Sequence, residues 1–215
     1  MTINKSKKYE PCYLLALHSS SETFGVAVLD YRDPTNTKRN ATFPIGKNLS
    51  NKIFSCVEKV LPSKAWKKLG RIAVSIGPGG FTGTRLSVVM ARTLSEQIGC
   101  QLDGISSFKL MAPRLVQFLE ISDQESPFWI IKELPRRGTI GGRYQVKYIH
   151  ENNNEIIELN KPHLIKKSNH LRPALLAKED ISKDTIELLD ICEQRHRNNQ
   201  PSSWENVLPI YPTSP

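Results

Sequence analysis

The spacing of hydrophobic residues in the first half of the chain predicts a small sheet accompanied by two helices. Short β-rich runs bounded by polar turns indicate strands, and apolar residues that recur every three or four positions indicate helices. A hairpin and a third strand followed by helix, strand and helix are typical of one α/β lobe. The predicted elements are strands over 13–17, 24–29 and 41–45, a helix over 49–61, a strand over 71–76 and a helix over 82–98.

The second half of the chain has a less regular pattern. Its apolar runs are short enough to be strands, and one later stretch has helical spacing. Before them, residues 105–112 look like a strand end and a helix start, which Pro113 should interrupt because proline lacks the backbone N–H that a helix needs. The other predicted elements are strands over 128–134, 144–149 and 156–159 and a helix over 181–195.

A glycine-rich loop lies between the strand predicted over 71–76 and the helix that follows it. The loop and the helix start read GPGGFTGTRLS from Gly77 onward. Glycines here permit either a tight turn that brings the helix close to the sheet or a cradle for an anion at the helix N-terminus. The Gly-Lys-Ser/Thr of a P-loop and the G-x-G-x-x-G of a dinucleotide site are both absent. We expect Thr82 to cap the helix through its hydroxyl.

Composition indicates an ordinary globular protein of 215 residues, with 39% hydrophobic and 24% charged residues. No apolar run approaches the roughly 20 residues that span a bilayer. The four cysteines are far apart in sequence, which favours reduced thiols and a cytoplasmic location over a disulfide framework or a zinc site. The basic start of the chain is expected to be a flexible tail rather than a secretory signal.

The net charge of +9 is unevenly distributed. Residues 1–113 carry 16 Lys/Arg and 7 Asp/Glu, whereas residues 114–215 carry 14 of each. Such an asymmetry is compatible with a nucleic-acid-binding face and equally with a surface that is basic but binds no nucleic acid. The densest basic patch consists of Lys59, Lys64, Lys67, Lys68 and Arg71.

The string GPGGFTGTRLS closely resembles the GPGSFTGLRIG signature of the TsaB (YeaZ) family. That family is bacterial and is needed to make threonylcarbamoyladenosine (t6A) in tRNA. The departures are Gly80 for serine, Thr84 for leucine and Ser87 for glycine. The signature residues carried over by this resemblance are Gly77, Pro78, Gly79, Gly80, Phe81, Thr82, Gly83 and Arg85.

The resemblance implies the α/β fold of the actin/sugar kinase/Hsp70 (ASKHA) superfamily, with one well-formed lobe and a reduced second lobe. We therefore expect a basic flexible tail over 1–12, an N-terminal lobe over 13–113 and a reduced C-terminal lobe over 114–215. The resemblance is strong up to about residue 113 and weak afterwards, where the ending Leu208-Pro-Ile-Tyr-Pro212 resembles the family's Pro-Val-Tyr-Leu-Arg.

Catalytic residues are hard to find in this sequence. Active superfamily members place an aspartate at the end of the first strand to organise the nucleotide's metal, and the matching residue here is His18. Because Mg²⁺ prefers hard oxygen ligands, His18 argues against ATP–Mg²⁺ chemistry and is interpreted as a strand-end histidine in a partly polar turn. No two of the five histidines are spaced as the His-x-x-x-His motif of TsaD-type paralogues requires, and we expect no catalytic residue, cofactor or metal on this chain.

The two helices of the first half carry apolar residues on more than one side, which predicts that one side faces the sheet and another faces a partner. The resemblance implies a heterodimer with the TsaD-type paralogue, or a homodimer, through these helices. The predicted interface residues are Leu49, Ile53, Phe54, Val57, Leu86, Val89, Met90 and Leu94.

Together with the absence of a recognisable catalytic set, the resemblance implies a non-catalytic scaffold subunit that binds and supports the TsaD-type transferase. The family also implies a TsaE-type ATPase partner and a TsaC-type enzyme that supplies the carbamoyl-adenylate, with ATP and metal on the partners. The tRNA would be contacted indirectly or through the basic face. Two alternatives stay open: a phosphotransferase-like protein that binds nucleotide in the Gly77–Gly83 loop, and a basic tRNA-binding module that acts alone.

Overall fold

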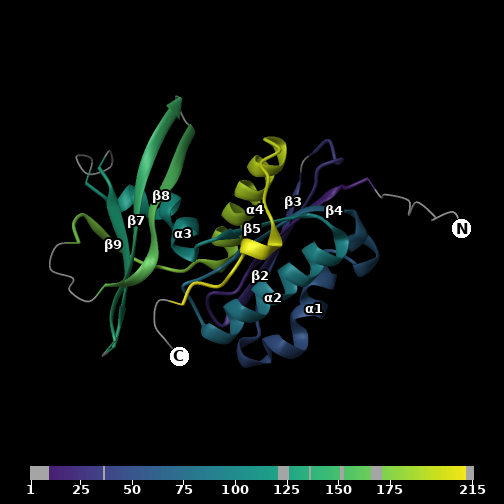
Figure 1. Ribbon diagram of the computed structural model, residues 1–215, viewed down its shortest axis with the longest axis horizontal. Coiled ribbons are helices and arrows are strands. Elements are labelled where there is room, and N and C mark those ends of the chain that lie inside the picture. The colour runs from purple at the N-terminus through teal and green to yellow at the C-terminus, as the bar shows by residue number, and fades with distance from the viewer. Residues whose placement is uncertain are drawn as a thin grey trace, which may run out of the picture.

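The computed structural model describes residues 10–35, 37–120, 126–135, 137–150, 153–165 and 171–211. These residues form two bodies that lie side by side, each built around one sheet (Figure 1). The first sheet has five strands in the order β3-β2-β1-β4-β5. Its strands are β1 (Tyr13–His18), β2 (Thr23–Asp30), β3 (Lys38–Pro44), β4 (Leu69–Ser75) and β5 (Gln101–Ile105).

The first sheet is mixed, because β1–β3 form an antiparallel meander whereas β4 and β5 continue parallel to β1. Helices α1 (Leu49–Val60) and α2 (Phe81–Ile98) cover one face, where Leu15 and Val26 belong to the core. Helix α4 (Ile181–Arg197) covers the other face, where Leu14 and Ala27 pack with Leu188. Alternate residues along β1 and β2 thus enter two different cores, as the pleat of a strand requires.

The second sheet has the order β8-β7-β6-β9, and α3 packs against it. A third core holds Phe128 and Tyr144 from this sheet and Phe108 and Met111 from α3. The elements of this body are α3 (Ser107–Leu115), β6 (Phe128–Leu134), β7 (Gly138–His150), β8 (Asn153–Ile165) and β9 (Ala174–Leu176). Short 3-10 turns are η1 (Gly46–Asn48), η2 (Ser63–Lys68), η3 (Val116–Phe118) and η5 (Trp204–Asn206).

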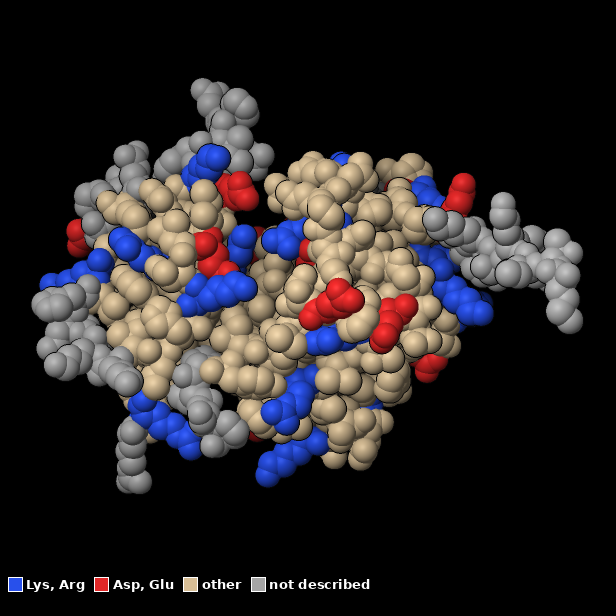
Figure 2. All heavy atoms as spheres, in the orientation of Figure 1, with Lys and Arg blue, Asp and Glu red and all other residues tan. Residues whose placement is uncertain are grey.

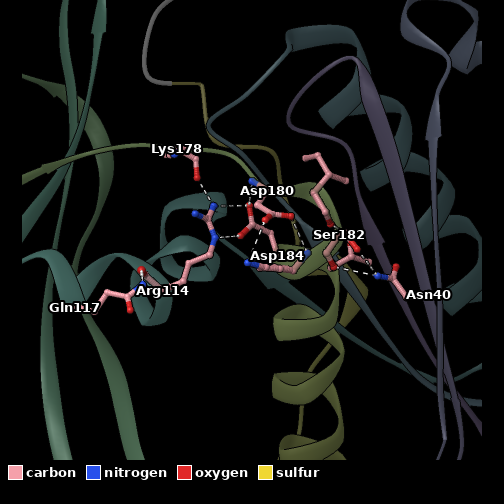
Figure 3. A network of polar contacts seen from close by, with 10 residues as sticks. Asn40, Arg114, Gln117, Lys178, Asp180, Ser182 and Asp184 are labelled. Carbon is pink, nitrogen blue, oxygen red and sulfur yellow. Dashed lines mark hydrogen bonds and ion pairs between the residues drawn. The ribbon is translucent and has the colours of Figure 1, made fainter.

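An ion pair joins the two bodies at the start of α4. The Arg114 guanidinium on α3 donates to both carboxylate oxygens of Asp184, at 2.9 and 3.2 Å, and also to the carbonyl of Lys178 (Figure 3). Asp184 is fully buried. On the β3 side of α4, the Asn40 amide donates to the Ser182 carbonyl at 3.1 Å. This network fixes the start of α4 between α3 and β3.

A second buried ion pair fixes the end of α4. Arg71 on β4 donates to Asp103 on β5 at 2.5 Å and to the Gln200 carbonyl at 2.8 Å. Arg195 on α4 donates to the other oxygen of Asp103 at 2.9 Å. Arg71 is 2% exposed, so it cannot belong to the basic surface patch in which the sequence placed it.

The predicted elements of the first half are all present, with small shifts at their ends. The division of the chain at residue 113 stays a prediction, and α4, which follows that residue, packs on the first sheet. Within the predicted tail, residues 1–9 lie outside the described residues. The N–H of Cys12 donates to the Lys68 carbonyl at 2.7 Å, and the Cys12 side chain is buried.

Three local predictions were wrong. Thr82 does not cap α2, because the helix begins one residue earlier and its N-cap is Gly80. Pro113 does not end α3, because its ring removes only one backbone donor and the buried side chains of Met111 and Leu115 hold the turn in the third core. Strand β7 begins at Gly138, inside the segment expected to connect two strands.

Candidate functional site

The glycine-rich loop packs directly against the turn between β1 and β2. A Cβ atom on Gly79 would lie 2.4 Å from the Cα of Ser20, and one on Gly83 would lie 2.6 Å from the Ser19 hydroxyl. Gly77 has φ +90°, a conformation that side chains rarely permit. Gly79 and Gly83 therefore let the loop approach the β1–β2 turn closely, and Gly77 permits the backbone conformation of the loop.

Polar groups of the loop form hydrogen bonds with other residues of the chain. The Gly80 N–H donates to the Ser20 carbonyl at 2.7 Å, and the Ser107 hydroxyl donates to the Pro78 carbonyl at 2.7 Å. The space beside Gly79 and Gly83 is filled by residues 19–20. The geometry thus favours the tight turn over the anion cradle.

His18 lies at the end of β1, directly before this turn, and is fully buried. Desolvation lowers the pKa of His18 to about 3, with a smaller contribution from the Arg114 charge. Neither ring nitrogen has a hydrogen-bond partner among the described residues. The residue is therefore neutral at physiological pH. It occupies its predicted place at the strand end but is completely removed from solvent.

The predicted interface residues divide into three groups by exposure. Leu49, Ile53, Val57 and Met90 are buried in the core between the first sheet and its two helices. Leu86 and Leu94 pack partly against the same core. Only Phe54 on α1 and Val89 on α2 point outward, with 56% and 55% of their surface exposed.

The outward face of α2 borders an open groove of about 520 Å³. One wall comes from α2 and includes Val88 and Val89. The other wall comes from residues 204–211, which we name the C-terminal strap and which include Leu208, 60% exposed. The Ile210 N–H donates to the Ile76 carbonyl at 2.8 Å, which ties the strap to the glycine-rich loop.

At one end of the groove, the strap and the signature loop meet in an aromatic–cation cluster. The Phe81 and Tyr211 rings lie 5.3 Å apart between centroids, and the Arg85 guanidinium lies 4.1 Å from the centre of the Phe81 ring. Arg85 also donates to the Tyr211 hydroxyl at 3.1 Å. The signature residues Phe81 and Arg85 thus form surface structure beside the groove.

Sequence reasoning predicted a partner surface on α1 and α2, which stays a prediction, and it did not include the strap. The only signal was the apolar ending from Leu208 to Tyr211, which local periodicity could not place against α2. Among the residues described, no group of three or more His, Cys, Asp or Glu side chains could hold a metal ion. No helix in the described part of the chain is long and apolar enough to cross a membrane.

Comparisons with known proteins find relatives that share part of this sequence. The family model described as TsaD, tRNA N6-adenosine threonylcarbamoyltransferase, matches residues 45–130. The chain is 32% identical over 101 residues to the tRNA threonylcarbamoyladenosine biosynthesis protein TsaB of Bacillus subtilis, covering 46% of this chain and 43% of that protein. It is 30% identical over 107 residues to TsaB of Buchnera aphidicola, covering 47% of each.

Solved structures extend the fold comparison along the chain. A Pseudomonas aeruginosa protein described as similar to peptidase YeaZ aligns with a TM-score of 0.68 and 17% identity, over 94% of this chain and all of that one. YeaZ from Pseudomonas aeruginosa aligns with a TM-score of 0.63 and 16% identity, over 93% and 99%.

The two sheets, the helices on both faces of the first sheet and these structural matches define an α/β protein that shares the fold of the YeaZ structures. The signature loop resembles that of the TsaB (YeaZ) family, and the relatives that match about half of this chain include two proteins described as TsaB. The matched stretch spans about half the length of the curated relatives.

Proposed function

We propose that this chain acts in tRNA threonylcarbamoyladenosine synthesis as a non-catalytic scaffold that binds a TsaD-type transferase. The observation that carries the proposal is the apolar surface formed by Phe54, Val89 and the groove beside the C-terminal strap. Curated relatives of this chain are described as threonylcarbamoyladenosine biosynthesis proteins. Exposed apolar patches of this kind mark protein-interaction sites.

The chemistry at the superfamily's usual catalytic position supports a scaffold. His18 is neutral and enclosed, and the hydroxyls of Ser19 and Ser20 are buried beside it. Nothing there combines an accessible nucleophile with a base and an orienting group. In this proposal ATP and metal are bound by partner subunits, including a TsaE-type ATPase.

The test is the solution mass of this chain mixed with the TsaD-type protein of the same genome, measured by light scattering after gel filtration. We expect a heterodimer. Val89→Arg and Phe54→Arg should each weaken it by at least about 30-fold in Kd, because a charge would replace an apolar side chain at the centre of the contact. Met90 is unsuitable for this test because it is buried in the core of this chain.

Leu176→Arg is the matched control, because Leu176 is 68% exposed on β9 of the other sheet. It should leave the heterodimer intact. The scaffold proposal fails if the two proteins elute separately, or if the purified chain alone transfers the threonylcarbamoyl group. Heat released on titration with Mg-ATP would favour the phosphotransferase alternative. Light scattering of the chain alone tests whether it forms a homodimer.

A further inference from the structure

A second cavity, of about 510 Å³, lies between the two bodies. Helices α3 and α4 and strand β8 line it, and α4 covers the face of the first sheet opposite α1 and α2. Figure 2 shows the surface hollowed between the two bodies, with basic and acidic side chains around the hollow. The volume is within the range of small-molecule pockets. This cavity is separate from the groove on α2.

Two side chains of opposite charge line this cavity without a direct partner. The Lys109 ammonium on α3 and the Glu187 carboxylate on α4 form no ion pair with any described residue, and they do not pair with each other. Desolvation lowers the pKa of Lys109, and the nearby Arg195 adds to this effect. Desolvation and Asp190 raise the pKa of Glu187 to about 7. Both groups are therefore held partly out of water without a direct counter-ion.

The neighbours of these two residues carry both charges, because Glu158 and Glu155 as well as Arg195 lie close enough to Lys109 to shift its pKa. Arg195, close enough to Lys109 to shift its pKa, is already paired with Asp103 at 2.9 Å. Asp190, beside Glu187, is already paired with Lys38. Lys109 and Glu187 are thus left to bind a molecule with both an anionic and a cationic group. Glu155 also lines the cavity and is exposed.

Apolar side chains complete the lining. Ile156 on β8 is 7% exposed, and Ile191 on α4 is half-buried. The side-chain amides of Gln194 and Gln200 line the same cavity and can donate or accept hydrogen bonds. The lining therefore offers a cation, an anion and an apolar wall.

We propose that this cavity binds a neutral α-amino acid, with its carboxylate on Lys109, its ammonium on Glu187 and its side chain against Ile156 and Ile191. Each charged group of such a ligand meets an oppositely charged, partly desolvated side chain, an arrangement in which hydrogen bonds are strongest. The proposal does not depend on the scaffold function. The experiments that test the two proposals concern different surfaces of the chain.

The experiment measures binding of neutral amino acids to the full chain at pH 8 and low salt, where Glu187 is ionised. Glycine, L-alanine, L-valine, L-leucine, L-methionine and L-phenylalanine are screened by saturation-transfer NMR, and hits are titrated by calorimetry. For L-leucine, the matched probes are 4-methylpentanoate, which lacks the ammonium group, and 3-methylbutylamine, which lacks the carboxylate. Corresponding analogues are made for any other hit.

We expect at least one amino acid to bind saturably and each of its two analogues to bind at least 10-fold more weakly. Lys109→Met and Glu187→Gln should each weaken binding by about 10- to 100-fold, because each removes one charged hydrogen bond. Lys183→Met is the charge-matched control on α4, where the Lys183 side chain is 75% exposed, and it should bind as the parent does. Thermal unfolding confirms that each variant is folded.

Three results would each overturn the proposal. The first is the absence of binding by every amino acid in the set to the folded parent chain. The second is equal affinity of the hit and either analogue, and the third is unchanged affinity in both Lys109→Met and Glu187→Gln. None of them affects the light-scattering test of the scaffold.

Discussion

At the scale of single residues, the signature loop distinguishes two adjacent glycines. A Cβ on Gly79 would lie 2.4 Å from Ser20, whereas the nearest atom to a Cβ on Gly80 is 3.8 Å away. Gly79→Ala should destabilise the chain by about 1–3 kcal/mol, because the β1–β2 turn must move to admit the methyl group. Gly80→Ala should change stability by less than about 0.5 kcal/mol.

Urea unfolding of the two variants measures this difference, and equal stabilities would contradict it. The result also bears on the family signature, in which serine takes the place of Gly80. An open position tolerates a small side chain, so this departure from the signature does not alter the loop.

His18 gives a prediction about pH. Its pKa is about 3 in the folded chain and near 6.5 when unfolded, so the unfolded state binds more protons between these values. The stability contributed by neutral His18 is therefore present above pH 6.5 and lost as pH falls toward 3, at about 1.4 kcal/mol per pH unit. Between pH 7 and pH 5 the loss should be about 2 kcal/mol.

His18→Leu should remove that part of the acid sensitivity, as shown by the free energy of unfolding in urea at both pH values. His163→Leu is the control, since it removes an exposed histidine on β8 instead of a buried one. If His18→Leu loses as much stability as the parent at pH 5, the histidine is not held neutral by burial.

The sequence predicted the apolar character of the two helices, but it did not predict which of their individual residues are buried. Helical spacing correctly showed that α1 and α2 are apolar on more than one side, yet it could not show that Met90 is buried while its neighbour Val89 is exposed. Adjacent positions differ by about 100° around a helix, so which one faces a core depends on where the sheet lies. That placement comes from tertiary packing.

At the scale of elements, α4 depends on its first-turn ion pair. Asp184 is fully buried, and its carboxylate accepts hydrogen bonds from the Arg114 guanidinium and the Asp180 N–H (Figure 3). Arg114→Ala should destabilise the chain by about 3–5 kcal/mol, because it leaves a buried carboxylate without its cation.

Arg32→Ala is the comparison, because the Arg32–Asp30 pair is exposed and such pairs contribute little to stability. Thermal unfolding of the two variants provides the measurement. A melting temperature for Arg114→Ala close to that of Arg32→Ala would mean that α4 is held mainly by its apolar contacts.

Long, periodic elements were predictable from sequence, and their ends were less so. The helix predicted over 181–195 is α4, and the strand predicted over 71–76 is β4. No local pattern indicated that α4 packs on β1, because that contact joins segments far apart along the chain. The start of β7 was missed because glycine, which is frequent among its first residues, is a poor strand signal.

At the scale of the whole molecule, part of the basic excess of the first half lies at the end of α1 and in the η2 turn that follows it. Lys59, Lys64 and Lys67 are exposed and Lys68 is half-buried, and none is in an ion pair with a described residue. If this surface contacts tRNA, the contact is to phosphates and is therefore salt-sensitive.

We expect the Lys64→Glu, Lys67→Glu, Lys68→Glu triple variant to bind tRNA more weakly than the parent and with a shallower dependence on salt. The log–log slope should fall by about 0.7–0.9 for each lysine that no longer neutralises a phosphate. Filter binding at several salt concentrations measures both quantities. The charge-matched triple variant Lys132→Glu, Lys161→Glu, Lys183→Glu should retain the parent's slope. Equal effects in the two triple variants would assign the change to net charge.

The candidate sites were predictable only where they lie on one continuous segment. The signature loop and its helix were found because their residues are neighbours in sequence. The groove needs the C-terminal strap, and the cavity needs α3, α4 and β8 together, so both exist only once distant segments are brought side by side.

The return of α4 to the first sheet also has a consequence for how the chain is made. A ribosome releases the strands of that sheet long before it releases α4, which covers Leu14, Ala16, Ala27 and Leu29. During that interval one apolar face of the nascent sheet has no cover, a state prone to aggregation and to capture by chaperones. The first sheet is therefore covered on both faces only after α4 has left the ribosome.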